Sequence, residues 1–173
     1  MKVPTHILKC VKSTCLDYDG RLVRCEIACS CKNYIFELLY PGETHLYQGE
    51  KIPCTLQLDD KFFFLIKARC AKCGCEYLLF DKDFHGWDGF VCHNDKEASH
   101  PRPPLVSWEC LKCGESKHTV QVEFCYGDED EMIEDLAGFP IDNLADAFEW
   151  IYINIKCVHC DLLTEKWVDY ETA

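Results

Sequence analysis

The sequence predicts a mainly β protein with short helices, an α+β chain built from two tandem antiparallel β units related by internal duplication. Three observations predict this class. Closely spaced cysteine pairs recur in both halves, stretches of alternating apolar and polar residues adjoin these pairs, and a polar, proline-rich segment separates the halves. We therefore expect a first unit with an N-terminal extension at residues 1–91, a linker at residues 92–104, and a second unit at residues 105–173.

The second half carries the clearest version of the pattern. One CxxC pair is Cys110 and Cys113, and the other is Cys157 and Cys160. Between the pairs, apolar residues alternate with polar ones, which is the period of a strand with one buried face. The apolar positions of the two expected strands are Val120, Val122, Phe124 and Tyr126, and then Ile151, Ile153 and Ile155.

The first half repeats this order in a looser form. Its pairs are Cys29 with Cys31, and Cys70 with Cys73. Strands are expected at residues 34–40 and at residues 61–69, and the second of these leads into the CxxC pair. When Cys70 is aligned with Cys157, an aromatic and aliphatic strand precedes the pair in both halves. Internal duplication is the economical interpretation.

Helical periodicity appears in an insertion that the first half lacks. Met132, Ile133 and Leu136 share one helical face, and Gly138 can end that helix. A second short helix, capped by Asp142, is expected to carry the apolar residues Leu144, Ala147 and Phe148. The HGWDG sequence at residues 85–89 is typical of a turn.

The chemistry of the pairs points to metal binding. A CxxC turn places two thiolates on one side of a tight loop, and two such turns complete a tetrahedral zinc site. Gly74 and Gly114 follow the second cysteine of their pairs and permit the positive φ that closes such a turn. The sequence thus predicts two zinc ions on eight ligands, which are Cys29, Cys31, Cys70, Cys73, Cys110, Cys113, Cys157 and Cys160.

The ligands of the first site stay open at this stage, because Cys29 and Cys31 are separated by a single residue. Cys25, Cys54 or Cys75 can take the place of one of the four. A third corner from Cys10 and Cys15 with Cys92 and His93 or His100 is a further alternative. Cys54 and Cys125 are expected to be packing residues, and His159, inside a pair, is expected at the surface.

Paired cysteine turns that each lead into a β-strand resemble the zinc-ribbon fold group, met here as two tandem copies. The resemblance rests on the eight cysteines and two glycines, and it implies a fold and a metal but no common activity. CxxCG turns in tetrathiolate sets are also similar to rubredoxin, which implies an iron electron-transfer protein as an alternative. Iron is the less favoured metal, and ligand type alone does not separate it from zinc.

Composition bounds the compartment and the partners. The chain has 15 cysteines, no apolar run of signal-peptide length and no apolar run that could span a bilayer, so we expect a cytoplasmic protein without a membrane partner. The formal net charge is −12, and two tetrathiolate zinc sites would bring it to about −16. Such a charge disfavours nucleic acid as the partner, although a nucleic-acid-binding zinc ribbon stays an alternative.

No catalytic motif is present. The sequence lacks a phosphate-binding loop, a nucleophile elbow and an HExxH helix. Four cysteines also fill every position of a zinc ion and leave none for an activated water. We therefore expect a protein that is not an enzyme, and whose structural metal sites support a protein-interaction or adaptor role. Thiol redox chemistry at a free CxxC pair ranks behind this hypothesis, because the pairs adjoin strands and not helix N-termini.

Overall fold

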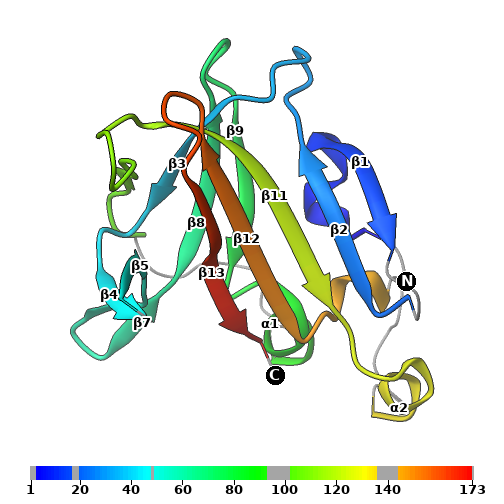
Figure 1. Cartoon of the computed structure of the whole chain (residues 1–173). Coiled ribbons are helices and arrows are strands. Elements are labelled where there is room, and N and C mark those ends of the chain that lie inside the picture. Colours follow the sequence, from blue (N-terminus) through cyan, green and yellow to red (C-terminus); the bar gives the residue numbers. More distant parts are fainter. Residues whose placement is uncertain (1–2, 17–19, 48, 93–101, 136–143, 173) are drawn as a thin grey trace.

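The computed structural model describes residues 3–16, 20–47, 49–92, 102–135 and 144–172 (Figure 1). Within them, nine antiparallel strands form the main sheet. They are β1 (Val11–Leu16), β2 (Leu22–Ile27), β3 (Phe36–Tyr40), β8 (Leu65–Cys70), β9 (Glu76–Asp81), β10 (Val106–Ser107), β11 (Lys117–Cys125), β12 (Trp150–Cys157) and β13 (Leu163–Glu171). The chain is therefore mainly β, as the sequence predicts.

Smaller elements surround this sheet. Two hairpins form separate two-stranded sheets in the described part of the chain: β4 (Thr44–Tyr47) with β5 (Glu50–Pro53), and β6 (Leu56–Leu58) with β7 (Lys61–Phe63). The helical segments are short, as expected, and comprise η1 (Thr5–Cys10), α1 (Gly86–Cys92), α2 (Glu129–Asp135) and η2 (Leu144–Asp146). None of the described helices has the length and apolar character that crossing a bilayer requires.

Strand β11 organises the topology because both of its edges are paired. One edge pairs with β12 from His118 to Cys125. The other edge pairs with β2 over residues 121–125 and with β3 over residues 117–118. Strands β2 and β3 therefore share an edge and then diverge, and β3 continues into β8 and β9. Because β2 comes from the first half and β11 from the second, one sheet contains strands of both halves.

The divergence of the sheet produces two layers with the core between them. In Figure 1, β8 and β9 lie behind β11, β12 and β13. Aromatic rings join the layers: Tyr40 of β3 lies 6.5 Å from Trp167 of β13, and Phe80 of β9 lies 5.1 Å from Tyr170 of β13. The alternating residues Val120, Val122, Phe124, Ile151, Ile153 and Ile155 are buried in this core, which confirms the two predicted strands of the second half.

Several local predictions need correction. The strand expected at residues 61–69 is interrupted at Phe64, which separates β7 from β8 and stacks on Tyr170 at a ring distance of 5.0 Å. The turn expected at residues 85–89 is wrong from Gly86 onwards, because helix α1 begins there. Helix α2 confirms that the first predicted helix exists, but Met132 is buried while Ile133 is exposed, so the two do not form one buried face. Leu136, Gly138 and Asp142 lie outside the described residues. The second predicted helix is present only as the 3-10 turn η2.

The predicted linker falls mostly outside the described residues, which omit residues 93–101. The division of the chain into units at 1–91 and 105–173 and their origin by duplication stay predictions. In the structure, β2 from the first half of the chain is hydrogen-bonded to β11 from the second half.

Candidate metal centres

The first cysteine group lies where β2 and β3 diverge. Cys29 and Cys31 stand in the turn between β2 and β3, and Cys70 and Cys73 stand in the turn between β8 and β9. The four Sγ atoms all lie within 4.8 Å of one another. The Sγ atoms of Cys29 and Cys73 are 3.4 Å apart, and those of Cys31 and Cys70 are 3.6 Å apart. These separations approach the sulfur–sulfur distance of about 3.8 Å that a tetrahedral site with Zn–S bonds of about 2.3 Å implies.

The second group repeats this geometry with the other four predicted cysteines. Cys110 and Cys113 precede β11, and Cys157 and Cys160 connect β12 to β13. Their Sγ atoms again lie within 4.8 Å of one another, with 3.5 Å from Cys110 to Cys160 and 3.6 Å from Cys113 to Cys157. The structure thus brings the eight predicted cysteines together in two sets of four. Each set can hold a metal ion.

The backbone explains why each turn presents two sulfurs on one side. In the three CxxC turns, the first cysteine donates its N–H to the carbonyl of the fifth residue after it and accepts the N–H of the fourth. The corresponding N···O distances are 2.8 and 2.9 Å at Cys70, 2.8 and 2.8 Å at Cys110, and 2.9 and 3.1 Å at Cys157. The turn of Cys29 and Cys31 closes in the same way with one residue fewer, through Asn33 at 2.7 Å and Lys32 at 2.8 Å.

All four turns end on a residue with positive φ directly after the second cysteine. Gly74 and Gly114 both have a φ of 74°, as their lack of a Cβ permits. Lys32, with a φ of 65°, and Asp161, with a φ of 58°, adopt the same conformation with a side chain. The glycine pattern in the sequence therefore identified two of the four turn ends. The tertiary structure imposes the strained conformation at the other two.

The two groups are also alike in their burial. In each group two cysteines are buried, one is half-buried and one is exposed. The exposed members are Cys73 and Cys113, which are the second cysteines of their CxxC pairs. Each centre therefore has two sulfurs anchored in the core and one edge that faces solvent.

Hydrogen bonds favour the thiolate form at Cys29 and Cys110, one buried cysteine of each group. Burial raises the pKa of Cys29, but the Tyr77 hydroxyl and the Cys31 N–H both donate to its sulfur and lower the pKa to about 6. Burial likewise raises the pKa of Cys110, but the N–H groups of Lys112 and Cys113 lower it to about 7. The thiolate is the form that binds metal.

The exposed thiols behave in the opposite way. At Cys113, a backbone N–H from Glu115 lowers the pKa, but desolvation by the surrounding atoms and hydrogen bonds with the neighbouring thiols outweigh it and raise the pKa to about 12. The pKa of Cys73 is also raised, in part by its contact with Cys29. Four negative charges cannot accumulate within 4.8 Å without compensation, so some thiols keep their protons. A bound dication would replace those protons.

The two groups lie on one row of paired residues across the sheet. Cys157 pairs with His118, His118 pairs with Phe36, and Phe36 pairs with Cys70. The groups are therefore about three strand spacings apart, at about 4.8 Å per spacing. His118 is only 1% exposed and Phe36 is fully buried. The turns after β2, β8 and β12 accordingly lie together at the upper end of the sheet in Figure 1.

The alternative ligands from the sequence do not enter either group. Cys25 is buried within β2, Cys54 lies between β5 and β6, and Cys75 is exposed just beyond the first centre. Cys10 donates its thiol to the carbonyl of Ile7 at 3.2 Å. The proposed partners of Cys10 and Cys15 lie outside what is described, since that includes neither the Cys92 side chain nor His93 and His100.

His159 and Cys125 lie outside the core. His159 is exposed in its turn, as expected. Cys125 is half-buried at the end of β11, on the open face of the sheet.

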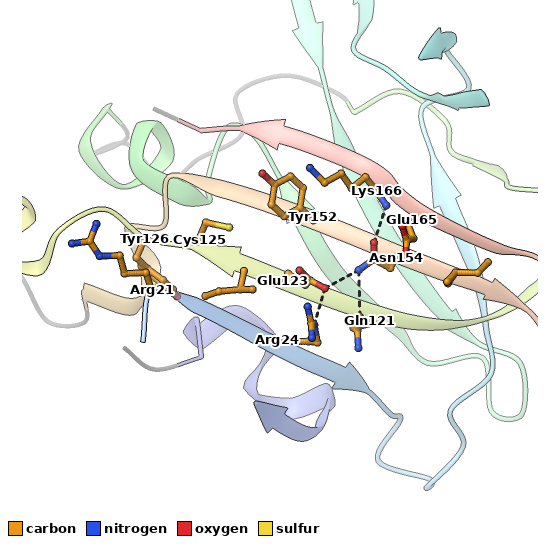
Figure 2. A pocket seen from close by; sticks show the side chains of 12 residues that line it. Arg21, Arg24, Gln121, Glu123, Cys125, Tyr126, Tyr152, Asn154, Glu165 and Lys166 are labelled. Atoms are coloured by element: carbon orange, nitrogen blue, oxygen red, sulfur yellow. Dashed lines mark hydrogen bonds and ion pairs between the residues drawn. The ribbon is translucent and has the colours of Figure 1, made fainter. Parts of the chain in front are cut away.

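That open face is hollowed into a groove of about 660 Å³ across β2, β11, β12 and β13 (Figure 2). Polar side chains cross its floor. Glu123 accepts hydrogen bonds from Arg24 Nε at 2.8 Å and from Asn154 Nδ2 at 2.9 Å, and Asn154 also contacts Gln121 at 3.3 Å. Lys166 closes the row by donating its backbone N–H to Asn154 Oδ1 at 2.7 Å. This row ties four strands together across the solvent-facing side of the sheet.

Sequence reasoning missed the residues that support the first centre from outside it. The Tyr77 hydroxyl donates to Cys29 Sγ at 3.1 Å, and Asn33 Nδ2 donates to Cys70 Sγ at 3.3 Å. Asn33 directly follows the shorter turn, so its position was a usable indication. Tyr77 reaches the centre only because β9 pairs with β8, and no short sequence motif predicts that Tyr77 contacts Cys29.

Comparison of the chain with family models, with curated protein sequences and with solved structures found no match.

Proposed function

We propose that this chain is a zinc-binding protein in which each cysteine group holds one structural zinc ion. The observation that carries the proposal is the convergence of eight sulfurs, from turns far apart in the sequence, into two sets with all members within 4.8 Å. Soft thiolate donors select zinc or iron over hard cations. Four protein ligands complete the coordination of zinc and leave no position for a substrate, which favours a structural role over a catalytic one.

The zinc ion of the first centre would stabilise a part of the fold where β3 and β11 share little backbone pairing. Strands β3 and β11 pair at only two positions there, so the join between the two layers is short at that end. A structural zinc site contributes on the order of 10 kcal/mol to folding. The proposal includes the two units at residues 1–91 and 105–173. Each centre draws its ligands from one unit, and the turns of both close in the same way.

Metal analysis tests the zinc assignment. Purified protein is expected to contain two zinc ions per chain and to be colourless, whereas a red iron protein would favour electron transfer. Cys113→Ser should remove one zinc and Cys73→Ser the other, while Cys15→Ser, at an exposed cysteine of β1, should retain both. Chelation should abolish the near-ultraviolet circular dichroism. Two zinc ions per chain in Cys113→Ser and Cys73→Ser would contradict the assignment of ligands.

We further propose that the chain binds a protein partner in a reducing compartment such as the cytoplasm. All described cysteines are free thiols, which supports that compartment. Large apolar side chains are exposed on the two hairpins, where Leu46 is 75% and Phe62 is 52% exposed. The hairpins project together from one side of the sheet in Figure 1. Exposed apolar patches of this kind are typical of protein-binding surfaces.

Substitution of the hairpin residues tests the interaction. Leu46→Ser combined with Phe62→Ser should lose the proteins that cross-link to the wild-type chain. Leu8→Ser, at a residue of η1 with 56% exposure, should keep them. An unchanged set of cross-linked proteins in the double variant would refute the hairpins as the binding surface.

A further inference from the structure

The two CxxC turns before β9 and β11 share a pattern of donors to sulfur. At Cys70, the N–H groups of Lys72 and Cys73 both donate to the first sulfur of the turn. At Cys110, the N–H groups of Lys112 and Cys113 do the same. In these two turns, the first sulfur thus receives the N–H groups of the second and third residues after it. Such donors fix the sulfur and reduce its excess charge.

The shorter turn at Cys29 cannot repeat this pattern. The second residue after Cys29 is Cys31, whose N–H lies 3.5 Å from Cys29 Sγ. The third is Lys32, and its N–H is already used to close the turn through the Cys29 carbonyl at 2.8 Å. One donor of the longer turns is therefore diverted by the loss of a residue.

Tyr77 occupies the place of that donor. Its hydroxyl donates to Cys29 Sγ at 3.1 Å, and the same oxygen accepts the N–H of Ser30 at 3.1 Å. The hydroxyl thus links the backbone of the shorter turn to Cys29 Sγ, the sulfur that lacks one backbone donor. The ring is held in position by its edge-on contact with Phe36 at a centroid distance of 6.3 Å and by the pairing of β9 with β8.

We propose that Tyr77 is a positioning residue that makes the CxC turn of Cys29 and Cys31 competent to bind metal. It replaces, through its hydroxyl, the backbone N–H that a CxxC turn would supply. This inference rests on the proposed zinc function, and it specifies which residue outside the four ligands the first centre needs. The second centre, with two CxxC turns, has no such requirement.

The test removes only the hydroxyl. Tyr77→Phe keeps the ring on Phe36, so the fold is retained. Zinc affinity is measured on the full chain by competition with a chromophoric chelator. Loss of an outer-shell hydrogen bond typically lowers metal affinity about 10- to 100-fold, and we expect that loss for one of the two zinc ions only. Tyr34→Phe, at a tyrosine with 55% exposure just after the same turn, is the matched control and should bind both ions as the wild type does.

A restoring insertion separates positioning from a general structural role. One glycine inserted between Ser30 and Cys31 converts the turn to CxxC and should restore the affinity of Tyr77→Phe to within a few-fold of the wild type. Unchanged affinity in Tyr77→Phe, or a loss that the insertion does not repair, would overturn the inference. Neither result would affect the zinc assignment, which fails only if the wild-type chain binds no zinc at its cysteines.

Discussion

Mild acid is expected to destabilise this fold through a stacked pair of half-buried histidines. The rings of His6 in η1 and His85 before α1 have centroids 3.7 Å apart. His6 Nε2 lies 3.0 Å from the carbonyl of Leu79, and His85 Nδ1 accepts the backbone N–H of Asp81 at 3.1 Å. Burial lowers the pKa of both rings, and the neighbouring His6 helps to lower the pKa of His85 to about 3.

The direction of this pH dependence is set by whether the folded or the unfolded chain binds more protons. An unfolded histidine has a pKa of about 6.5, so below that pH the unfolded chain takes up a proton that the folded chain refuses. The free energy of unfolding therefore falls as the pH falls from 6.5 toward 3. Between pH 7.5 and pH 5.5, His85 alone accounts for about 1.4 kcal/mol. Protonating both rings in place would set two charges 3.7 Å apart, a repulsion of roughly 4 kcal/mol at an effective dielectric constant of about 20.

Neighbouring charges modify this trend without reversing it in that range. Asp146 faces His6 and raises its pKa, although burial outweighs it. Burial raises the pKa of the Asp81 carboxyl, which Arg102 contacts at 3.0 Å. Asp81 therefore favours the folded state on acidification, with its effect concentrated nearer to its ordinary pKa of 3.8.

Urea unfolding of zinc-loaded protein at pH 7.5 and pH 5.5 measures the effect, with His85→Asn as the reference. Asparagine retains an acceptor for the Asp81 N–H but does not titrate. Proton uptake by cysteines affects both proteins alike, so the difference between them isolates the ring. The wild type should lose about 1.4 kcal/mol more than the variant. Equal losses would refute the assignment of the acid sensitivity to His85.

Gly86 and Lys32 both have a positive φ, and substitutions at these two positions are expected to change the stability of the fold. A Cβ on Gly86 would clash with the Thr172 side chain, whereas one on Gly20 meets nothing within 4 Å, and both glycines have positive φ. Gly86→Ala should therefore cost about 2 kcal/mol more than Gly20→Ala in urea unfolding, and equal costs would contradict the clash. Lys32 has a φ of 65°, so Lys32→Gly should raise the unfolding midpoint by relieving about 1 kcal/mol of strain, and a lower midpoint would exclude that strain.

Local patterns predicted the elements that a short window of sequence determines. Val120, Val122 and Phe124 alternate with polar residues because one face of β11 is buried, and a strand follows from that period alone. The cysteine spacing was informative for a similar reason, since a tight turn holds both sulfurs of a pair. Which pairs converge was also accessible, because each group takes its two pairs from one half of the chain.

Other features depend on contacts between residues far apart in the sequence, which no short stretch of sequence reveals. The pairing of β2 with β11 joins residues about a hundred positions apart, and the sequence of neither strand indicates which strand it pairs with. The interruption at Phe64 arises because its ring stacks on Tyr170, at the far end of the chain. Helix α1 begins at Gly86, where the sequence resembles a turn, and its first N–H groups find acceptors in Phe148 and Thr172. Tertiary hydrogen bonds decided that conformation.

The double pairing of β11 has a consequence for biosynthesis. Strands β2 and β3 leave the ribosome long before residues 117–125, and until then the shared edge that β11 will fill stays open. Open strand edges are sites of aggregation, and nascent chains are exposed to this risk for as long as a partner strand is untranslated. A chain that ends at residue 91 keeps all four cysteines of the first centre, yet it can never close that edge. Such a truncated product is therefore expected to need chaperones even when zinc is abundant.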